Sequence, residues 1–193
     1  MESQLFQNKF RIKSTRLPDY DYSSNGAYYV TICTKGREYF FGKIINGKMV
    51  LSEIGEIVEI FWYQIPKYFE TIELDEFIVM PDHVHGIIIV DNERNIDNER
   101  DIDNERDIDN ERDIDNERCR DGVTPSLHYR QRPTLGQIVG YFKYQSTKSI
   151  NKFRNMPGVP IWQTRFHEHI IRDERELNIK RRYIINNPIN WKM

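Results

Sequence analysis

Residues 77–90, FIVMPDHVHGIIIV, leave few options for local structure. Two runs rich in β-branched residues flank Pro81 and Asp82, a dipeptide typical of tight turns. We therefore expect two antiparallel strands joined by that turn. The second run, residues 83–90, is apolar at most positions, as in a strand buried in the middle of a sheet. The rest of the chain must supply the strands and helices that cover it.

Other strand-like stretches carry β-branched and aromatic residues between polar turns. They are residues 28–34, 38–45, 48–51 and 166–172. The second and third of these flank Asn46 and Gly47, a strong signal for a two-residue β-hairpin turn. We therefore expect a small hairpin in addition to the main strands.

Three helices are predicted from apolar periodicity and from capping residues. The first is capped by Ser52 and is expected to stop at Pro66. The second begins with a capping box of Thr134 and Gln137 and runs to about residue 153. The third, residues 173–187, begins with a second capping box and is expected to end before Pro188.

With the hairpin set aside, the order is strand, helix, strand, strand, helix, strand, helix. This βαββαβ order is that of a ferredoxin-like α+β domain, an antiparallel sheet with helices on one face. Here an extra β-hairpin and a C-terminal helix are added. The chain has 193 residues, and we treat residues 1–193 as a single domain.

Residues 91–118 repeat the six-residue unit DNERDI almost without change. The isoleucines fall six apart, which suits neither a helical nor a strand stripe. We interpret the segment as a low-complexity, disordered insertion outside the fold, with a binding role as the alternative. It holds eight Asp, five Glu and five Arg, so the rest of the chain has 23 Lys and Arg against 17 Asp and Glu. That remainder, with a net charge of +6, suits an acidic partner such as nucleic acid.

The chain shows no sign of export or membrane insertion. No apolar stretch is long enough to span a bilayer, and the N-terminal residues lack the apolar core of a secretory signal. Two cysteines, Cys33 and Cys119, are too few for a disulfide framework. We therefore expect a cytoplasmic protein.

His83 and His85 interrupt the apolar second run at a spacing of two, so both lie on one face of the predicted strand. Two imidazoles at this spacing can hold a divalent metal and leave coordination positions open. The alternative is a pair that only forms hydrogen bonds. Candidates for a third ligand are Asn187, Glu168, and a second pair with the same spacing, His167 and His169.

A candidate nucleophile lies in residues 181–191, RRYIINNPINW. Tyr183 and Asn187 are four residues apart, so both lie on one face of the predicted helix. A phenol with an ordinary pKa of about 10 is a weak nucleophile at neutral pH, and a nearby metal or cation makes it useful by favouring phenolate. Tyr141 and Tyr144 are competing candidates. The alternative for Tyr183 is a packing role with its hydroxyl at the surface.

These motifs resemble those of a known family. The segment MPDHVHG is similar to the HUH motif (His, hydrophobic, His) of the single-tyrosine transposases, and YIINNP resembles the tyrosine motif of their REP-associated branch. Supporting similarity lies in residues 17–34 and 161–191. The likeness covers nearly the whole chain except residues 91–118.

The resemblance implies a specific chemistry. His83 and His85 would bind a divalent metal, Mg²⁺ or Mn²⁺, with Asn187 as an amide ligand. Tyr183 would attack a phosphodiester of single-stranded DNA, giving a 5′-phosphotyrosine and a free 3′-hydroxyl that are later rejoined. Physically, this is metal-assisted transesterification.

The resemblance also implies a DNA partner, single strands that form imperfect hairpins, and a location at the nucleoid. The family includes dimers and monomers, so a homodimer stays open. Cations suited to the DNA backbone lie on and near the predicted tyrosine helix. These DNA-binding candidates are Lys143, Lys148, Arg165, Arg172, Lys180, Arg181 and Arg182.

Two rivals to a DNA transposase remain from the sequence. The first is a non-catalytic, domesticated protein of the same fold that binds single-stranded DNA hairpins. The second is a metal-dependent hydrolase that uses the histidine pair with water as the nucleophile. Products that never become linked to protein would favour the hydrolase.

Overall fold

The computed structural model describes residues 17, 19–93 and 132–191, and the predicted strand pair is present in it. Strand β4 (Ile72–Met80) and strand β5 (His83–Val90) are antiparallel, with Met80 opposite His83 across the turn at Pro81 and Asp82. In β5, seven of the eight residues are buried. This matches the expectation of a central strand.

The main sheet has four strands in the order β4-β5-β1-β6. Strand β1 (Gly26–Cys33) lies between β5 and β6 (His167–Ile171) and is antiparallel to both. Numbered among the four core strands alone, the order is 2-3-1-4. That is the strand order of the predicted ferredoxin-like, antiparallel fold.

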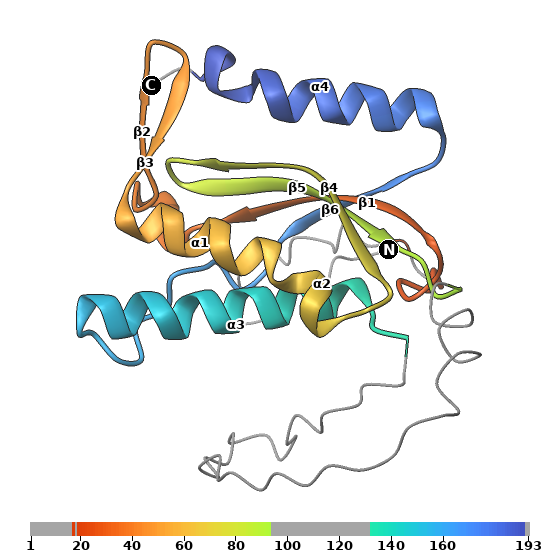
Figure 1. The fold of residues 1–193 in the computed structure, drawn as a ribbon, viewed down its shortest axis with the longest axis horizontal. Coiled ribbons are helices and arrows are strands. Elements are labelled where there is room, and N and C mark those ends of the chain that lie inside the picture. The colour runs from red at the N-terminus through yellow and green to blue at the C-terminus, as the bar shows by residue number, and fades with distance from the viewer. Residues whose placement is uncertain (1–16, 18, 94–131, 192–193) are drawn as a thin grey trace, which may run out of the picture.

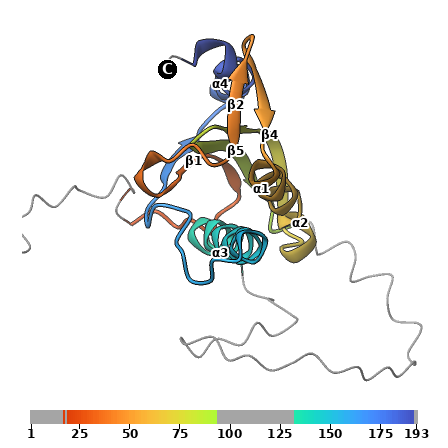
Figure 2. The ribbon, with the colours of Figure 1, turned by 90° about the vertical axis from the view of Figure 1, so that its left-hand side faces the viewer.

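The helices form a layer on each face of this sheet (Figures 1 and 2). Helix α1 (Glu53–Tyr63), the short α2 (Ile65–Tyr68) and α3 (Leu135–Arg154) cover one face. The main core lies under them, built around Trp62, Tyr28 and Phe142. Of the helices in the described residues, only α4 (Glu174–Asn190) covers the opposite face.

The additional hairpin is also present. Strands β2 (Gly42–Ile45) and β3 (Lys48–Leu51) pair through a turn in which Asn46 and Gly47 have φ of 51° and 71°. Positive φ at both positions is what the Asn-Gly pair was expected to supply. The hairpin tip lies against the last turn of α4, since a Cβ at Gly47 would be 3.5 Å from Ile189.

Two helix boundaries predicted from prolines are wrong. Pro66 does not simply end α1, because it occupies the first turn of α2, where its missing N–H costs nothing. Pro188 lies inside α4, and the helix continues to Asn190. At this position the proline removes only the bond to the carbonyl of Ile184, in the last turn, and the helix accommodates it.

Most of the DNERDI repeat lies outside the described residues, and so the prediction made for residues 91–118 is not addressed beyond residue 93. Among the residues that are described, none of the helices combines the length and apolar character required to cross a membrane.

Candidate active site

The histidine pair lies in the middle of the sheet, on the face covered by α4. His83 and His85 are only 5% and 4% exposed, and their Nε2 atoms are 2.9 Å apart. Burial lowers the pKa of both imidazoles, and it lowers that of His85 to about 3. Both rings are therefore neutral at neutral pH, the state in which imidazole binds metals.

Each imidazole is oriented by hydrogen bonds at its Nδ1. The Asp82 carboxylate lies 2.6 Å from Nδ1 of His83 and accepts a hydrogen bond from its N–H. The Nδ1 of His85 lies 2.7 Å from the hydroxyl of Tyr29 and 2.9 Å from that of Thr31. Because Nδ1–H of the neutral His83 ring donates to Asp82, the Nε2 of His83 carries a lone pair, and Nε2–H of His85 donates to it. A cation bound by both Nε2 atoms would require the His85 proton to move to Nδ1, where the hydroxyl oxygens of Tyr29 and Thr31 can accept it in a hydrogen bond.

Helix α4 is fixed above the pair by apolar and ionic contacts. Ile184 packs into a small cluster with Tyr29 and Ile87. The Arg181 guanidinium binds the Asp75 carboxylate with two nitrogens, Nε at 2.9 Å and Nη2 at 2.6 Å. This contact lowers the pKa of Asp75. Asp75 lies where the pairing of β4 with β5 is irregular, between residues 74 and 77.

The start of α4 is fixed to β6. The Asp173 side chain accepts a hydrogen bond from the backbone N–H of Glu176, as an N-cap should. The Glu176 carboxylate contacts His169 on β6 and accepts from the N–H of Arg172. It therefore does not close the predicted capping box, which would require a bond to the N–H of Asp173.

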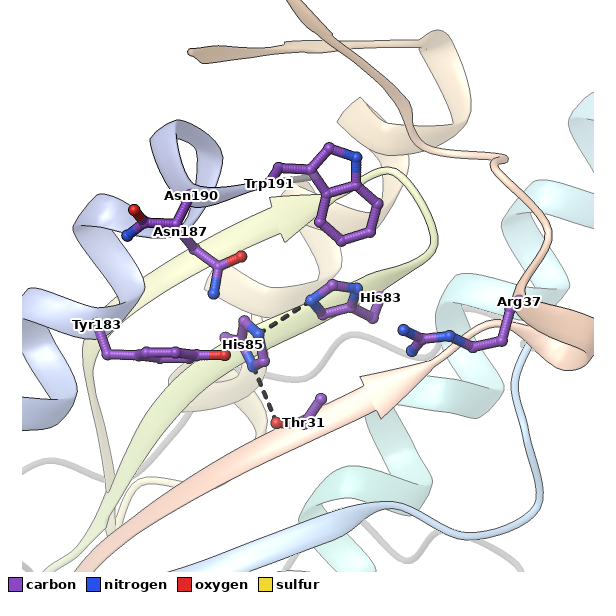
Figure 3. A pocket seen from close by; sticks show the side chains of 8 residues that line it. All are labelled: Thr31, Arg37, His83, His85, Tyr183, Asn187, Asn190 and Trp191. Atoms are coloured by element: carbon purple, nitrogen blue, oxygen red, sulfur yellow. Dashed lines mark hydrogen bonds between the residues drawn. The ribbon is translucent and has the colours of Figure 1, made fainter. Parts of the chain in front are cut away.

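Tyr183 and Asn187 occupy the face of α4 that looks down on the pair. The ring centroid of Tyr183 is 5.3 Å from that of His85, and its hydroxyl is directed toward that ring (Figure 3). Tyr183 is 51% exposed, so a substrate can reach it. One turn later, Asn187 is 9% exposed and its amide is directed toward the histidines. The continuation of α4 through Pro188 keeps Asn187 helical and on this face.

These side chains line a pocket of about 420 Å³, here called the histidine pocket. Its lining is Thr31, Arg37, His83, His85, Tyr183, Asn187, Asn190 and Trp191. A second pocket of about 400 Å³ adjoins it and shares Thr31, His85 and Tyr183, so the tyrosine is accessible from two sides. Lys180 and His167 line this second pocket.

The donor set fits a divalent cation. Two neutral imidazole nitrogens face each other, and an amide side chain is directed toward them from α4. The carboxylate on Nδ1 of His83 is the usual outer support of a metal-binding histidine. Imidazoles suit Mn²⁺, Co²⁺ or Zn²⁺, whereas Mg²⁺ prefers oxygen ligands. No cluster of three His, Cys, Asp or Glu suited to a metal occurs in the described part of the chain. Asn187 is the amide side chain that could add a ligand to the two imidazoles.

The other candidate ligands lie away from the pair. His167 is in register with Thr31, which is in register with His85, so it is two strands distant, roughly 10 Å. His169 is bound to Glu176. Glu168, between these two histidines in β6, is directed toward the opposite face of the sheet because side chains alternate along a strand.

The competing tyrosines are separated from the pair by the sheet. Tyr141 and Tyr144 lie on α3, on the face opposite α4 (Figure 1). Tyr141 stacks on Tyr68 with a centroid distance of 4.1 Å. Of the three tyrosines considered from the sequence, only Tyr183 shares a pocket with the histidines.

Among the predicted DNA-binding cations, those of α4 differ from one another in surroundings. Lys180 lines the second pocket, and its ammonium is 4.6 Å from the ring centroid of Tyr29. Arg181 is engaged by Asp75. Arg182 is exposed.

The remaining predicted cations lie on β6 and α3. Arg165 and Arg172 are exposed near the two ends of β6. Lys148 is exposed on α3, on the other side of the sheet. Lys143, also on α3, donates to the backbone carbonyls of Gln163 and Thr164, and burial lowers its pKa.

Several residues of the site were missed from the sequence. Asp82 directly precedes the histidine pair, and its position was read only as part of a turn. Tyr29 and Thr31 alternate along β1, a spacing that places both on one face. Arg37 and Trp191 carried no signal in the sequence, because each lies at or just after the end of an element and reaches the pocket only through the fold.

Comparison with known proteins finds a sequence relative and similar solved structures. No protein-family profile matches the chain. An uncharacterized protein of Haemophilus influenzae is 36% identical over 181 residues, which cover 93% of this chain and 89% of the relative. The structure of a REP-associated tyrosine transposase bound to a REP hairpin is similar with a TM-score of 0.51 and 15% identity. That match covers 93% of this chain and 74% of the transposase.

Proposed function

This chain belongs to one family with the Haemophilus influenzae relative, a family with the single-tyrosine transposase fold, and we propose that it is a DNA transposase. It nicks and rejoins single-stranded DNA by metal-assisted transesterification. Tyr183 is the nucleophile, and the intermediate is a 5′-phosphotyrosine. The protein is thus a single-strand endonuclease and ligase in one site.

The observation that carries this proposal is the meeting of α4 with β5. A phenol that is half exposed and a paired, neutral imidazole lie with ring centroids 5.3 Å apart, at the edge of an open pocket. A nucleophile beside candidate metal ligands is the arrangement that phosphoryl transfer by covalent catalysis requires. Neither rival suggested by the sequence needs Tyr183 at this place.

The step conserves the number of phosphoester bonds. The Tyr183 oxygen bonds to the phosphorus of a phosphodiester as the phenol loses its proton. The bond from phosphorus to the 3′-oxygen breaks, and that oxygen takes up a proton to become a free 3′-hydroxyl. In the reverse direction a 3′-hydroxyl attacks the phosphotyrosine, so rejoining needs no external energy.

The other pocket residues support this step. Asp82 and Tyr29 fix the orientation of the two imidazoles through their Nδ1 atoms. His83, His85 and Asn187 would hold a divalent ion, for which we propose Mn²⁺ or Mg²⁺, and such an ion would supply polarisation of the phosphate and stabilisation of the departing oxygen. Lys180, in the adjoining pocket, adds positive charge near Tyr183.

The choice of DNA as the substrate rests on the similar structure and on charge. That transposase is bound to a REP hairpin, and the present chain without residues 91–118 has a net charge of +6. We therefore propose single-stranded DNA that forms hairpins as the partner.

The test is incubation of the protein with Mn²⁺ and labelled hairpin-forming single strands taken from the DNA that flanks the coding region. On a denaturing gel we expect a covalent protein–DNA band. Tyr183→Phe should abolish it. Tyr144→Phe is a matched control, since Tyr144 is 53% exposed and lies on α3, and it should leave the band unchanged.

Two outcomes would overturn the proposal. Binding of the hairpin without any covalent band, across Mn²⁺ and Mg²⁺, would identify a non-catalytic DNA-binding protein. Cleaved ends that never become linked to protein would identify a hydrolase that uses water.

A further inference from the structure

The end of the histidine pocket farthest from Tyr183 is formed by aromatic and cationic side chains that the reaction above does not use. The ring centroid of Trp191 is 5.6 Å from that of His83. Tyr39 lies beyond it, 6.2 Å from Trp191 between centroids, and is 61% exposed. In Figure 3, Tyr183 is at one side of the pair, and Trp191 and Arg37 are at the other.

These residues are held in place by the fold, but they do not belong to the main hydrophobic core. Trp191 is the first residue after α4, and its backbone N–H contacts the carbonyl of Pro188 at 3.4 Å. Arg37 ends a short 3₁₀ turn (Lys35–Arg37) that follows β1, and it has φ of 60°, a conformation costly for a residue with a side chain. Trp62 and Trp162, by contrast, are buried in the main core.

The Arg37 side chain is held at this end of the pocket. Its Nε donates to Asp82 at 2.8 Å, and its Nη1 donates to the sulfur of Cys33. Nη2 takes part in neither bond. The guanidinium is directed toward His83 (Figure 3), so a phosphate near the pair lies within its field.

The geometry of the proposed reaction indicates which part of the DNA lies at this end of the pocket. In phosphoryl transfer the attacking and leaving oxygens lie roughly in line on opposite sides of the phosphorus. The Tyr183 oxygen approaches from the His85 side. The departing 3′-oxygen, with the nucleotide that carries it, must then leave on the side of His83, Trp191 and Arg37.

We propose that Trp191, with Tyr39 behind it, is a stacking site for the base of the nucleotide that keeps the free 3′-hydroxyl. This inference rests on the proposed function, since it names the place of the leaving strand in that site. Stacking accepts every base, because each has an aromatic face, so the site contributes affinity without a sequence preference. It also retains the 3′-hydroxyl near the phosphotyrosine for rejoining.

The first experiment measures stacking without cleavage. Full-length Tyr183→Phe protein without metal is titrated with a fluorescent oligothymidylate of about 12 nucleotides, and with a strand of equal length that has the backbone but no bases. Trp191→Ala should weaken oligothymidylate binding by roughly 5- to 150-fold, the range for loss of one stacked base. Binding of the baseless strand should not change. Trp191→Phe should retain most of the affinity, which separates lost stacking from a misfolded helix end.

The control is Phe153→Ala. Phe153 is 52% exposed on α3, on the other side of the sheet, and its removal should leave both affinities as they were. Equal binding of oligothymidylate by Trp191→Ala and its parent would overturn the proposal. So would an equal loss for the two strands.

The second experiment locates the base. In wild-type protein that forms the covalent band, 2-aminopurine is placed on either side of the mapped cleavage position. Quenching that depends on Trp191 is expected only on the side of the free 3′-hydroxyl, and quenching on the other side would contradict the assignment. If no covalent band forms while binding still depends on Trp191 and on bases, the proposed nicking reaction fails and the stacking surface stands.

Discussion

Replacing Gly86 by alanine tests the packing beneath the strand that carries the histidine pair. A Cβ at this position would lie 2.3 Å from Cζ2 of Trp62, 2.7 Å from its Cη2 and 3.1 Å from Cδ2 of Phe77. Carbon atoms normally pack about 3.5–4.0 Å apart, so the indole or the strand must move by more than about 1 Å. Trp62 is fully buried, stacked on Phe77 and in edge contact with Phe142, which leaves it no free direction.

Overpacking of this kind costs about 1–3 kcal/mol, and we expect Gly86→Ala at the upper end because the clash is with a ring. The assay is urea unfolding, in which the midpoint should fall while the slope stays near the wild-type value. Gly140→Ala is the matched control. Apart from the adjacent residues and the backbone of its own helix, no atom of the described residues lies within 4 Å of the added Cβ, and alanine inside a helix should stabilise by about 0.5–1 kcal/mol. If both variants unfold at or above the wild-type midpoint, the packing of β5 against Trp62 is wrong.

Three further predictions concern the site. The pKa of His85 falls from an ordinary 6.5 to about 3 on folding. Below pH 6.5 the unfolded chain therefore binds a proton at His85 that the native chain does not bind, and stability falls as the pH falls. In EDTA this effect lowers the free energy of unfolding by about 2 kcal/mol between roughly pH 7.5 and pH 5. Urea unfolding of His85→Gln at both pH values should show a correspondingly smaller loss than the wild-type protein. Asp82→Ala leaves Nδ1 of His83 without its acceptor and should weaken Mn²⁺ binding, followed by electron paramagnetic resonance, by about 10- to 100-fold. Unchanged affinity would exclude a role for Asp82 in orienting His83. Asp75→Ala removes the partner of Arg181 on β4 and should speed amide hydrogen exchange in α4 but not in α3. An equal change in both helices, or no change, would show that this ion pair does not hold α4.

The sequence predicted the elements whose signals are local. The strand at residues 83–90 and the caps at Ser52 and Thr134 are recognisable from neighbouring residues, and the structure has them at these positions. The start of β4 was placed five residues late, because residues 72–76, IELDE, are rich in acidic side chains. Acidic side chains are tolerated here because β4 is an edge strand of the sheet.

The site was predicted only in part, because it depends on which segments meet. The histidine pair and Tyr183 could be proposed from the motifs, yet the residues alone did not separate Tyr183 from the tyrosines of α3. That separation comes from the two helices lying on opposite faces of the sheet (Figure 1). Likewise, Thr31 lies beside His85 because of the register of β1 with β5. The register between two distant strands cannot be deduced from either strand alone.

Peptide mapping of the covalent protein–DNA product will decide whether the phenol above the histidine pair is the group that is joined to DNA. After nuclease treatment and proteolysis, mass spectrometry should find a nucleotide-modified tyrosine at Tyr183 and at no other residue, and the modification should disappear in His83→Ala. A modification on Tyr141 or Tyr144, or a Tyr183 adduct that forms equally well without both histidines, would contradict the account.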